Sequence, residues 1–277
     1  MKKNTLFLVG FLSLVSLTAF SQQDISVKKG QKFEVESVTR FSSSAQVMGQ
    51  SMESTADSKT ITAYEVTDAR KDGADLTSVI KKLTATSSAM GQSSSYDSDK
   101  TDNSGPLADA LSGMVNKPKK ISVDNKGKMV GQPTEDENEV AIPGISTSGT
   151  KTDLFIPVLL GKKLAVGETI TDSSSVKKEK MDSKVSGTYT VKSVDNGIAT
   201  VLYTGKEVVS ATIEQMGMEM INNATNMINS TIVVDLKTGM VVSNTSEVQS
   251  ESIIEVSGME IPASSKTTVT TTVKAVN

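Results

Sequence analysis

Polar and apolar residues alternate along much of this chain, and Ser and Thr supply many of the polar positions. The last stretch, 264–276, reads SSKTTVTTTVKAV. A period of two places one set of side chains on each face of a strand. The pattern therefore predicts mainly β structure, with half-buried strands and a strand at the C-terminus.

Turn residues separate the alternating stretches. Asp72-Gly73 and Asn196-Gly197 are the strongest signals. A two-residue hairpin turn of this kind needs positive φ at both central residues, which Asn, Asp and Gly tolerate best. We therefore expect a hairpin at each of these two places.

Apolar residues also recur with helical spacing in two stretches. The first follows Pro106, which suits a first helical turn, and stops before Lys117-Pro118. Its apolar positions are Leu107, Ala110, Leu111, Met114 and Val115. The second runs from about Met218 to Asn229, with apolar positions Met220, Ile221, Ala224, Met227 and Ile228. Spacings of three and four residues line one face of a helix, so each predicted helix should pack on a sheet.

Short segments recur in the same order in two parts of the chain. The residues GQKF at 30–33 match GETI at 167–170. The further matches pair 41–44 with 172–175, 62–73 with 187–197, 84–92 with 210–218, and 121–130 with 232–242. Ordered internal similarity is typical of a repeated structural unit. The fold class predicted is β-rich α+β: two related antiparallel β units, each with one helix.

The repeat also suggests the domain boundaries. We expect a first unit at 22–131, an acidic linker or long loop at 132–152, and a second unit at 153–277. The second unit opens with DLFIPVLLGKKL at 153–164, the most apolar stretch after the N-terminus. Pro157 interrupts it, so we expect a buried extended segment or a short helix there.

The N-terminus has the pattern of a secretory signal peptide. Lys2 and Lys3 precede an apolar run from Thr5 to Phe20, and small residues precede the Ser21-Gln22 bond. We therefore expect residues 1–21 to be removed near that bond and the protein to be exported, either to the periplasm or outside the cell. The run is too short to span a bilayer, and no later stretch approaches that length. No lipoprotein cysteine is present, because the chain has no Cys.

Composition excludes several kinds of chemistry. The chain has no His and no Cys, which removes His-dependent hydrolases, His zinc sites and thiol chemistry. Its net charge is −3, so nothing attracts nucleic acid. It also has no Trp and few other aromatic residues, which argues against a stacking surface for sugars or bases.

The layout resembles a known family. Val166-Gly167-Glu168 opens the second unit, and the VDLKTG turn at 234–239 precedes two long C-terminal strands. Together with the signal peptide, these features resemble a family of exported bacteroidete β-rich proteins of unknown function. The likeness covers most of the mature chain. Members of the family often carry a lipoprotein cysteine and an aromatic after the Gly-acid pair, and this chain has neither. The resemblance implies export and a β-rich fold, and it implies no activity.

Two short motifs match known catalytic or metal-binding patterns only in part. Ser78–Lys81 and Lys237–Gly239 match parts of a Ser-Lys hydrolase pattern, but the Ser-Asp-Asn element is missing. Asp97, Asp99 and Asp102 gather oxygen ligands as a calcium loop does, without the Gly and the final acid of an EF-hand. We therefore expect no enzymatic activity and no cofactor, and at most a weak calcium site.

Methionines give the one binding hypothesis. The stretch EQMGMEM at 214–220 could be a cuprous site, ordinary core or an adaptable apolar surface. Met and Gly adjoin at Met48, Met90, Met216 and Met259. If these lie at hairpin tips on one side, they form an apolar rim for a lipophilic small molecule. The sequence thus favours a non-catalytic protein that binds or carries a hydrophobic ligand in the cell envelope. The alternative is a structural or protein-interaction module of the envelope.

Overall fold

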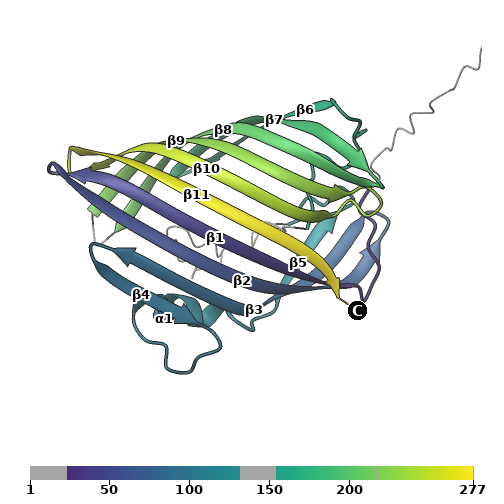
Figure 1. The fold of residues 1–277 in the computed structure, drawn as a ribbon, viewed down its shortest axis with the longest axis horizontal. Coiled ribbons are helices and arrows are strands. Elements are labelled where there is room, and N and C mark those ends of the chain that lie inside the picture. Colours follow the sequence, from purple (N-terminus) through teal and green to yellow (C-terminus); the bar gives the residue numbers. More distant parts are fainter. Residues whose placement is uncertain (1–23, 132–153, 216–217, 277) are drawn as a thin grey trace, which may run out of the picture.

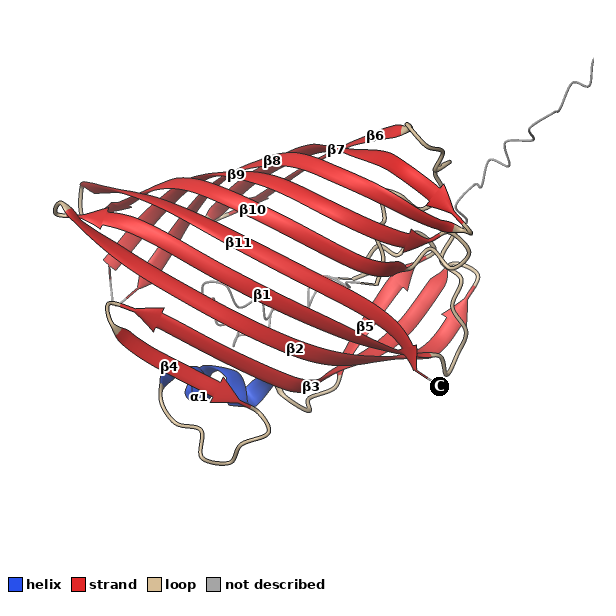
Figure 2. Ribbon diagram, viewed as in Figure 1, coloured by secondary structure: helices blue, strands red, loops and turns tan. Residues whose placement is uncertain are grey.

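One antiparallel sheet dominates the molecule. The computed structural model describes residues 24–131, 154–215 and 218–276. In these residues eleven strands form a single sheet, with one α-helix and one short 3-10 helix (Figure 2). Side by side, the strands follow the order β4-β3-β2-β1-β11-β10-β9-β8-β7-β6, and β5 also pairs with β3. In chain order the elements are β1 (Lys32–Val47), β2 (Gln50–Arg70), β3 (Gly73–Ala89), β4 (Gln92–Asp97), α1 (Pro106–Leu111), η1 (Ser112–Met114), β5 (Lys119–Asp124), β6 (Thr169–Lys178), β7 (Met181–Asp195), β8 (Ile198–Gln215), β9 (Met218–Asp235), β10 (Val241–Val256) and β11 (Met259–Val276).

The sheet is continuous from the first strands of the chain to the last. β1 pairs with β11 over a long antiparallel ladder, from Lys32 opposite Val276 to Ala45 opposite Ala263. The prediction of a mainly β, antiparallel fold is thereby confirmed. The finer prediction of two units, each with its own helix, is not supported, because one sheet runs through both parts and α1 is the single α-helix of the described residues.

The second predicted helix is a strand. β9 begins at Met218 and pairs with β8 on one side and β10 on the other. Met220, Ala224 and Ile228 share one face of β9, because a spacing of four residues fits a period of two as well as a helix. Met227 was expected to pack inward, but it lies on the other face and is 46% exposed. Asn at 222, 223, 226 and 229 also favours a helix poorly, and two neighbouring strands satisfy the backbone of β9.

The two predicted hairpins are present. Asn196 and Gly197 both have positive φ and form the turn between β7 and β8, as expected. The β2–β3 hairpin is also correct, but its turn residues are Lys71 and Asp72, because Arg70 pairs with Gly73. Gly73 is thus the first residue of β3. A Cβ there would collide with the carbonyl oxygen of Val123 on β5, which explains the glycine.

The sheet curves strongly, and its concave side holds the core (Figure 1). In the strand order, β3 and β8 are six positions apart, which is roughly 29 Å across a flat sheet. The adjacent residues Leu159 and Leu160 nevertheless pack into two different clusters. Leu159 packs with residues of β7–β9, and Leu160 packs with residues of β1–β3 and β5. The sheet therefore bends around the segment 154–164, and we call the side that faces this segment the inner face.

The segment 154–164, which we call the plug, closes one end of the curved sheet. Leu154, Phe155, Leu159, Leu160 and Leu164 are all buried. It contains turns and an isolated bridge between Phe155 and Met240, so the expected burial of this stretch is found. We call this end of the sheet the plugged end. The opposite end, which carries the β1–β2, β3–β4, β6–β7 and β10–β11 turns, is called the tip end.

The helix α1 covers a second, smaller part of the inner face. It begins at Pro106, as predicted from the sequence. Leu107, Ala108 and Leu111 pack against Leu83, Ala85 and Tyr96 of β3 and β4. The described residues contain no helix that is long and apolar enough to cross a membrane.

Candidate functional site

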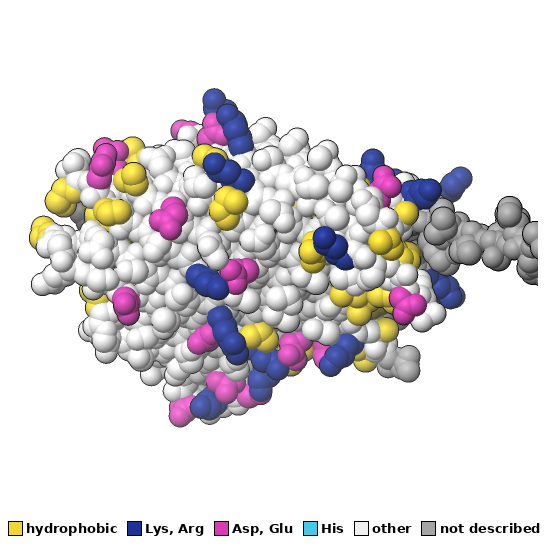
Figure 3. Space-filling view, turned by 45° about the horizontal axis from the view of Figure 1, so that its top comes forward, with side chains coloured by type: hydrophobic (Ala, Val, Ile, Leu, Met, Phe, Trp, Pro, Cys, Tyr) yellow, Lys and Arg dark blue, Asp and Glu magenta, His cyan; other side chains and the backbone are white. Residues whose placement is uncertain are grey.

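Charge is distributed unequally between the two faces of the sheet. Strand register assigns the paired residues of β1, β2 and β8–β11 to the inner or the outer face. Among the side chains of these strands that the structure describes, all charged ones except one fall on the outer face, which also carries charges in Figure 3. The exception is Glu207 on β8. We call the inner face of these six strands, from the plug to the tip end, the trough.

Glu207 is held by neutral hydrogen-bond donors from both neighbouring strands. The hydroxyl of Ser183 on β7 donates to Oε1 at 2.7 Å, and Nδ2 of Asn226 on β9 donates to Oε2 at 2.9 Å. Ser183 is buried and Glu207 is half-buried. Such bonds fix the carboxylate without neutralising its charge. It is a positioned acceptor group, and within β1, β2 and β8–β11 it is the one charged side chain that register assigns to the inner face.

A polar row crosses the trough at Glu207. Antiparallel pairing links Glu207 to Asn226, Asn226 to Ser250, and Ser250 to Ser265. Ser265 pairs in turn with Ser43 of β1, whose hydroxyl lies 2.7 Å from that of Ser54 on β2. The next row toward the plug contains Phe41, Val248 and Ile228 and is more apolar. The trough therefore alternates between polar and apolar rows along its length.

Two tyrosines lie beside Glu207 on the plugged side. Tyr189 and Tyr203 are cross-strand partners whose ring centroids are 4.5 Å apart. Burial raises the pKa of Tyr203 above its usual value, and the carboxylates of Asp172 and Glu207 raise it further. Burial is also the main cause of the raised pKa of Tyr189. Both phenols therefore stay protonated at neutral pH.

The Tyr203 ring lies over a pair of glycines. Gly187 and Gly205 face each other on β7 and β8, and a Cβ on either would collide with the ring or hydroxyl of Tyr203. Glycine in a strand interior usually marks a close approach by another group. These two glycines are thus explained by the tyrosine that covers them.

Small and apolar side chains line the trough beyond the polar row, toward the tip end. Ala45 pairs with Met52 and Ala263, Ile254 pairs with Ile261, and Val256 pairs with Met220 and Met259. All except Met259 are half-buried. None of them belongs to a buried cluster formed by the described residues. We call this set the apolar mouth; its residues are Ala45, Met52, Met220, Ile254, Val256, Ile261 and Ala263.

Three of the four methionines singled out in the sequence lie at hairpin tips of the same end. Met48 is in the β1–β2 turn, Met90 is in the β3–β4 turn, and Met259 follows the β10–β11 turn (Figure 1). Their side chains are 88%, 74% and 51% exposed, respectively. Met216 lies outside the described residues. Successive hairpins are two strand spacings apart, about 10 Å, so the methionines form separate apolar points along the mouth.

Met48 and Met90 also occupy an unfavourable backbone conformation. Their φ angles are 50° and 51°, a left-handed region in which side chains without a local hydrogen bond are uncommon. At the plugged end, Asn196 fills the equivalent turn position with φ 50°. Neither turn preference nor packing explains the two methionines, and strained residues often mark functional positions.

The calcium candidates do not converge. Asp99 forms an ion pair with Lys82, and the backbone amide of Asp99 donates to the carboxylate of Asp97. Asn103 bonds to both the backbone amide and the carbonyl of Asp97, which holds this loop together. In the part of the chain that the structure describes, no three acidic, His or Cys side chains are grouped to hold a metal ion.

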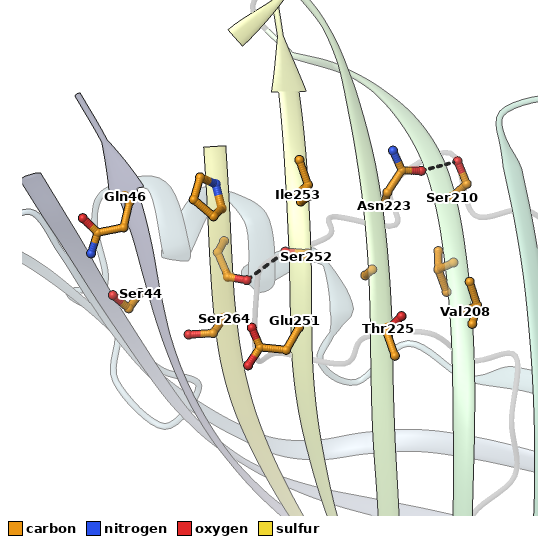
Figure 4. A pocket seen from close by; sticks show the side chains of 14 residues that line it. Ser44, Gln46, Val208, Ser210, Asn223, Thr225, Glu251, Ser252, Ile253 and Ser264 are labelled. Atoms are coloured by element: carbon orange, nitrogen blue, oxygen red, sulfur yellow. Dashed lines mark hydrogen bonds between the residues drawn. The ribbon is translucent and has the colours of Figure 1, made fainter. Parts of the chain in front are cut away.

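The outer face carries a shallow depression near the tip end. It has a volume of about 570 Å³ and crosses β8, β9, β10, β11 and β1 (Figure 4). Its side chains come mainly from two cross-strand rows: Ser44, Ser264, Glu251, Thr225 and Val208, followed by Pro262, Ile253, Asn223 and Ser210. The hydroxyl of Ser210 donates to Oδ1 of Asn223 at 2.7 Å. These exposed, mixed side chains offer an apolar ligand less protection than the half-buried trough.

The sequence indicated the methionines at the hairpin tips but not the trough. Glu207 looks like any other acid until strand register assigns it to the inner face. One usable signal was present: the stretch GKEVV at 205–209 places Lys206 and Glu207 on opposite faces of a strand, so one charge had to lie inside.

Part of the chain matches a family of unknown function. Residues 156–241 match the model of that family, DUF6263, which covers most of the segment 154–164 and the strands β6 to β9. The expected resemblance to a family without an assigned function is confirmed for this part. No curated protein matches the chain.

Solved structures give only distant similarities. Lipovitellin aligns with a TM-score of 0.47 at 12% identity, over 91% of this chain and 26% of its own, so this chain spans about a quarter of lipovitellin. The COG4313 outer membrane channel from Pseudomonas putida F1 aligns with a TM-score of 0.25 at 8% identity, over 90% of this chain and 97% of its own. OpdQ of Pseudomonas aeruginosa gives 0.26 at 9% identity, over 91% and 100%. Similarities this distant carry no functional argument.

Proposed function

We propose that the chain is an exported, non-catalytic protein that binds a lipophilic molecule in its trough, within the cell envelope. The observation that carries this proposal is the contrast between the two faces of the sheet. The trough is uncharged apart from Glu207, whereas the outer face of the same strands carries the charges. Binding sites for small apolar molecules are concave, largely apolar and supplied with a few placed polar groups.

The tip end supports this proposal as the route of entry. The apolar mouth lies there, and no buried cluster of the described residues includes its side chains. Exposed Met48, Met90 and Met259 stand at its edge. Methionine adapts to varied apolar shapes, which suits a passage for a lipophile. The signal-peptide pattern at the N-terminus supports export.

A neutral lipophilic dye tests the proposal. N-phenyl-1-naphthylamine should bind the wild type saturably, with a rise in fluorescence. Ser265→Arg should weaken this binding by roughly tenfold or more, because it places a bulky cation in the middle of the trough. Ser264→Arg is the matched control. It changes the neighbouring residue of the same strand, which points to the outer face and is already exposed.

The two variants separate a trough from a nonspecific surface. Equal affinity of both variants, or no saturable binding by the wild type, contradicts the proposal. Thermal unfolding of each variant shows whether the fold is kept. The Ser264→Arg protein should bind the dye as the wild type does.

A protein-interaction role is the second candidate, and the edge strand β6 favours it. β6 ends the strand order, pairs only with β7 among the described strands, and is exposed along most of its length. A free strand edge can accept a strand from another protein. Under this alternative the dye would not bind saturably, while a partner complex would depend on residues 169–178.

A further inference from the structure

We infer that the trough selects lipophiles whose polar group donates hydrogen bonds, an amine above all and then a hydroxyl, and that Glu207 is the residue that anchors this group. The inference rests on the proposed function, since it names the class of ligand for the same site. It also gives the direction of the hydrogen bonds in the site: the ligand donates them and the protein accepts them.

The first step concerns the charge of Glu207. Its contacts are the neutral hydroxyl of Ser183 and the neutral amide of Asn226. In β1, β2 and β8–β11, Lys and Arg side chains all lie on the outer face, so these strands offer no cation to Glu207. A sheltered carboxylate gains most from a positive partner. A bound amine would supply that partner.

The second step concerns the other polar atoms of the trough. Among the described residues, two buried side-chain polar atoms lack a hydrogen-bond partner: Oδ1 of Asn222 and Oδ1 of Asn244. Register places both on the inner face, on β9 and β10. Both are acceptors. Buried polar groups without a partner are rare in folded proteins, so these two favour a ligand that brings donors of its own.

The third step is the position of Glu207 along the trough. The polar row that contains it is flanked by apolar rows on both sides. Phe41, Val248 and Ile228 lie toward the plug, and Ala45, Ala263 and Ala224 lie toward the mouth. Adjacent inward rows are about 7 Å apart. A polar group held at Glu207 therefore leaves an attached chain in contact with apolar side chains as it runs to the mouth.

Carboxylate ligands fit this arrangement poorly. A fatty acid would bring a second negative charge to Glu207, with no Lys or Arg on the inner face of these strands to offset it. Like charges repel strongly where water is scarce. The site should therefore bind an amine, an alcohol and a carboxylate with different affinities, even when all three carry the same alkyl chain.

Displacement of the neutral dye by dodecylamine, dodecanol and dodecanoate tests the inference. The amine should displace the dye best, then the alcohol, and the carboxylate should be at least roughly tenfold weaker than the amine. Glu207→Gln keeps the shape and should abolish the preference for the amine over the alcohol. Glu251→Gln is the matched control: it removes an acid from the outer face of β10, and the order should not change.

The outcomes separate this inference from the proposed function. Saturable dye binding with no ranking of head groups, or with dodecanoate tightest, overturns the inference and leaves lipophile binding intact. A ranking unchanged in Glu207→Gln overturns the role of Glu207. Absence of dye binding overturns the proposed function and the inference with it. Ser183→Ala gives a second variant in case Glu207→Gln folds poorly, and it should weaken the amine preference by loosening the carboxylate.

Discussion

β9 and the segment from β4 to β5 each pair with a long strand, β8 and β3 respectively, but they are built differently. β9 pairs with β8 without interruption, from Gln215 opposite Met218 to Ile198 opposite Asp235. On the other side of the sheet, two short strands share the edge of β3. β4 pairs with 84–89 and β5 pairs with 73–78. Between them the chain leaves the sheet and forms α1.

The difference decides which part of the inner face is filled. α1 lies over β3 and β4, and Leu107 and Leu111 bury Leu83 and Tyr96 there. No such excursion interrupts β9, so the described residues place no helix over Asn226 and Ile228, which remain half-buried. One sheet thus carries a filled core under α1 and a trough that no helix of the described residues covers, and a short excursion of the chain makes the difference.

The largest effect should come from removing apolar volume where the inner face is filled. Leu111 is the last residue of α1, and its side chain is completely buried. Leu111→Ala should lower the free energy of unfolding by about 2–4 kcal/mol, because it leaves a cavity. Ile228→Ala in the half-buried trough should cost less than half as much. Urea denaturation of both variants measures the difference, and equal losses would mean that the trough is as well packed as the α1 region.

Overpacking the glycine pair of β7 and β8 should have the next largest effect. Gly205→Ala places a Cβ against the Tyr203 ring, which must move. We expect a loss of about 1–3 kcal/mol in the free energy of unfolding, together with a weaker Tyr203 contact to Tyr189. Tyrosine fluorescence and urea denaturation can follow both changes. Gly197→Ala is a useful contrast, because no atom lies within 4 Å of its added Cβ and the strain there comes from the backbone alone.

A smaller change in the free energy of unfolding, of opposite sign, is expected at the methionines of the hairpin tips. Met48→Asn should raise the free energy of unfolding by about 0.5–1 kcal/mol, because Asn tolerates the positive φ better than Met. The reverse substitution, Asn196→Met at the plugged end, should lower it by a similar amount. If the methionines guide ligands to the trough, Met48→Asn should also weaken dye binding, whereas Asn196→Met should not. A Met48→Asn protein that loses stability would show that Met48 has a packing role.

The smallest effect concerns the edge of β3 that β5 covers. Arg70 donates to Asp75 at 2.5 and 3.0 Å, and the Ser122 hydroxyl of β5 donates to the same carboxylate. The Arg70 hydrogen bonds, followed by that of Ser122, lower the pKa of Asp75 to about 2. The stabilisation is therefore complete above about pH 4 and is lost as the pH falls toward 2.

Because these groups are more than a third exposed, Asp75→Asn should cost under about 1 kcal/mol at neutral pH. The difference from the wild type should shrink as the pH falls through 2 and disappear below it in urea denaturation. Asp57→Asn, on the exposed outer face of β2, is the control. A difference that persisted well below pH 2 would assign the effect to packing and not to the ion pair.

Local sequence signals predicted the strands and several boundaries well. Alternation indicated the long C-terminal strand, Asn196-Gly197 indicated its turn, and Pro106 marked the start of α1. Each depends on neighbours within a few residues. The helix predicted for the β9 stretch was wrong for a physical reason. Met220, Ala224 and Ile228 fit the period of a helix and that of a strand, and pairing with β8 and β10 decided between them.

The trough depends on pairings that no local pattern contains. The inward position of Glu207 follows from a register with Asn226 and Val185, which lie on different strands. The gathering of Met48, Met90 and Met259 at one end follows from the turns that join successive strands. The sequence could name these methionines as a possible rim, but only the order of strands brings them together.

The most direct test uses the absence of tryptophan from the chain. A single Trp is introduced at Val248, which faces the trough, or at Gln249, which is its exposed neighbour on β10. A brominated long-chain alcohol, which quenches Trp on contact, is then titrated into each protein. We expect saturable quenching of the Val248→Trp protein and little quenching of the Gln249→Trp protein. Equal quenching of both, or quenching of the outer position alone, would contradict a lipophile site in the trough.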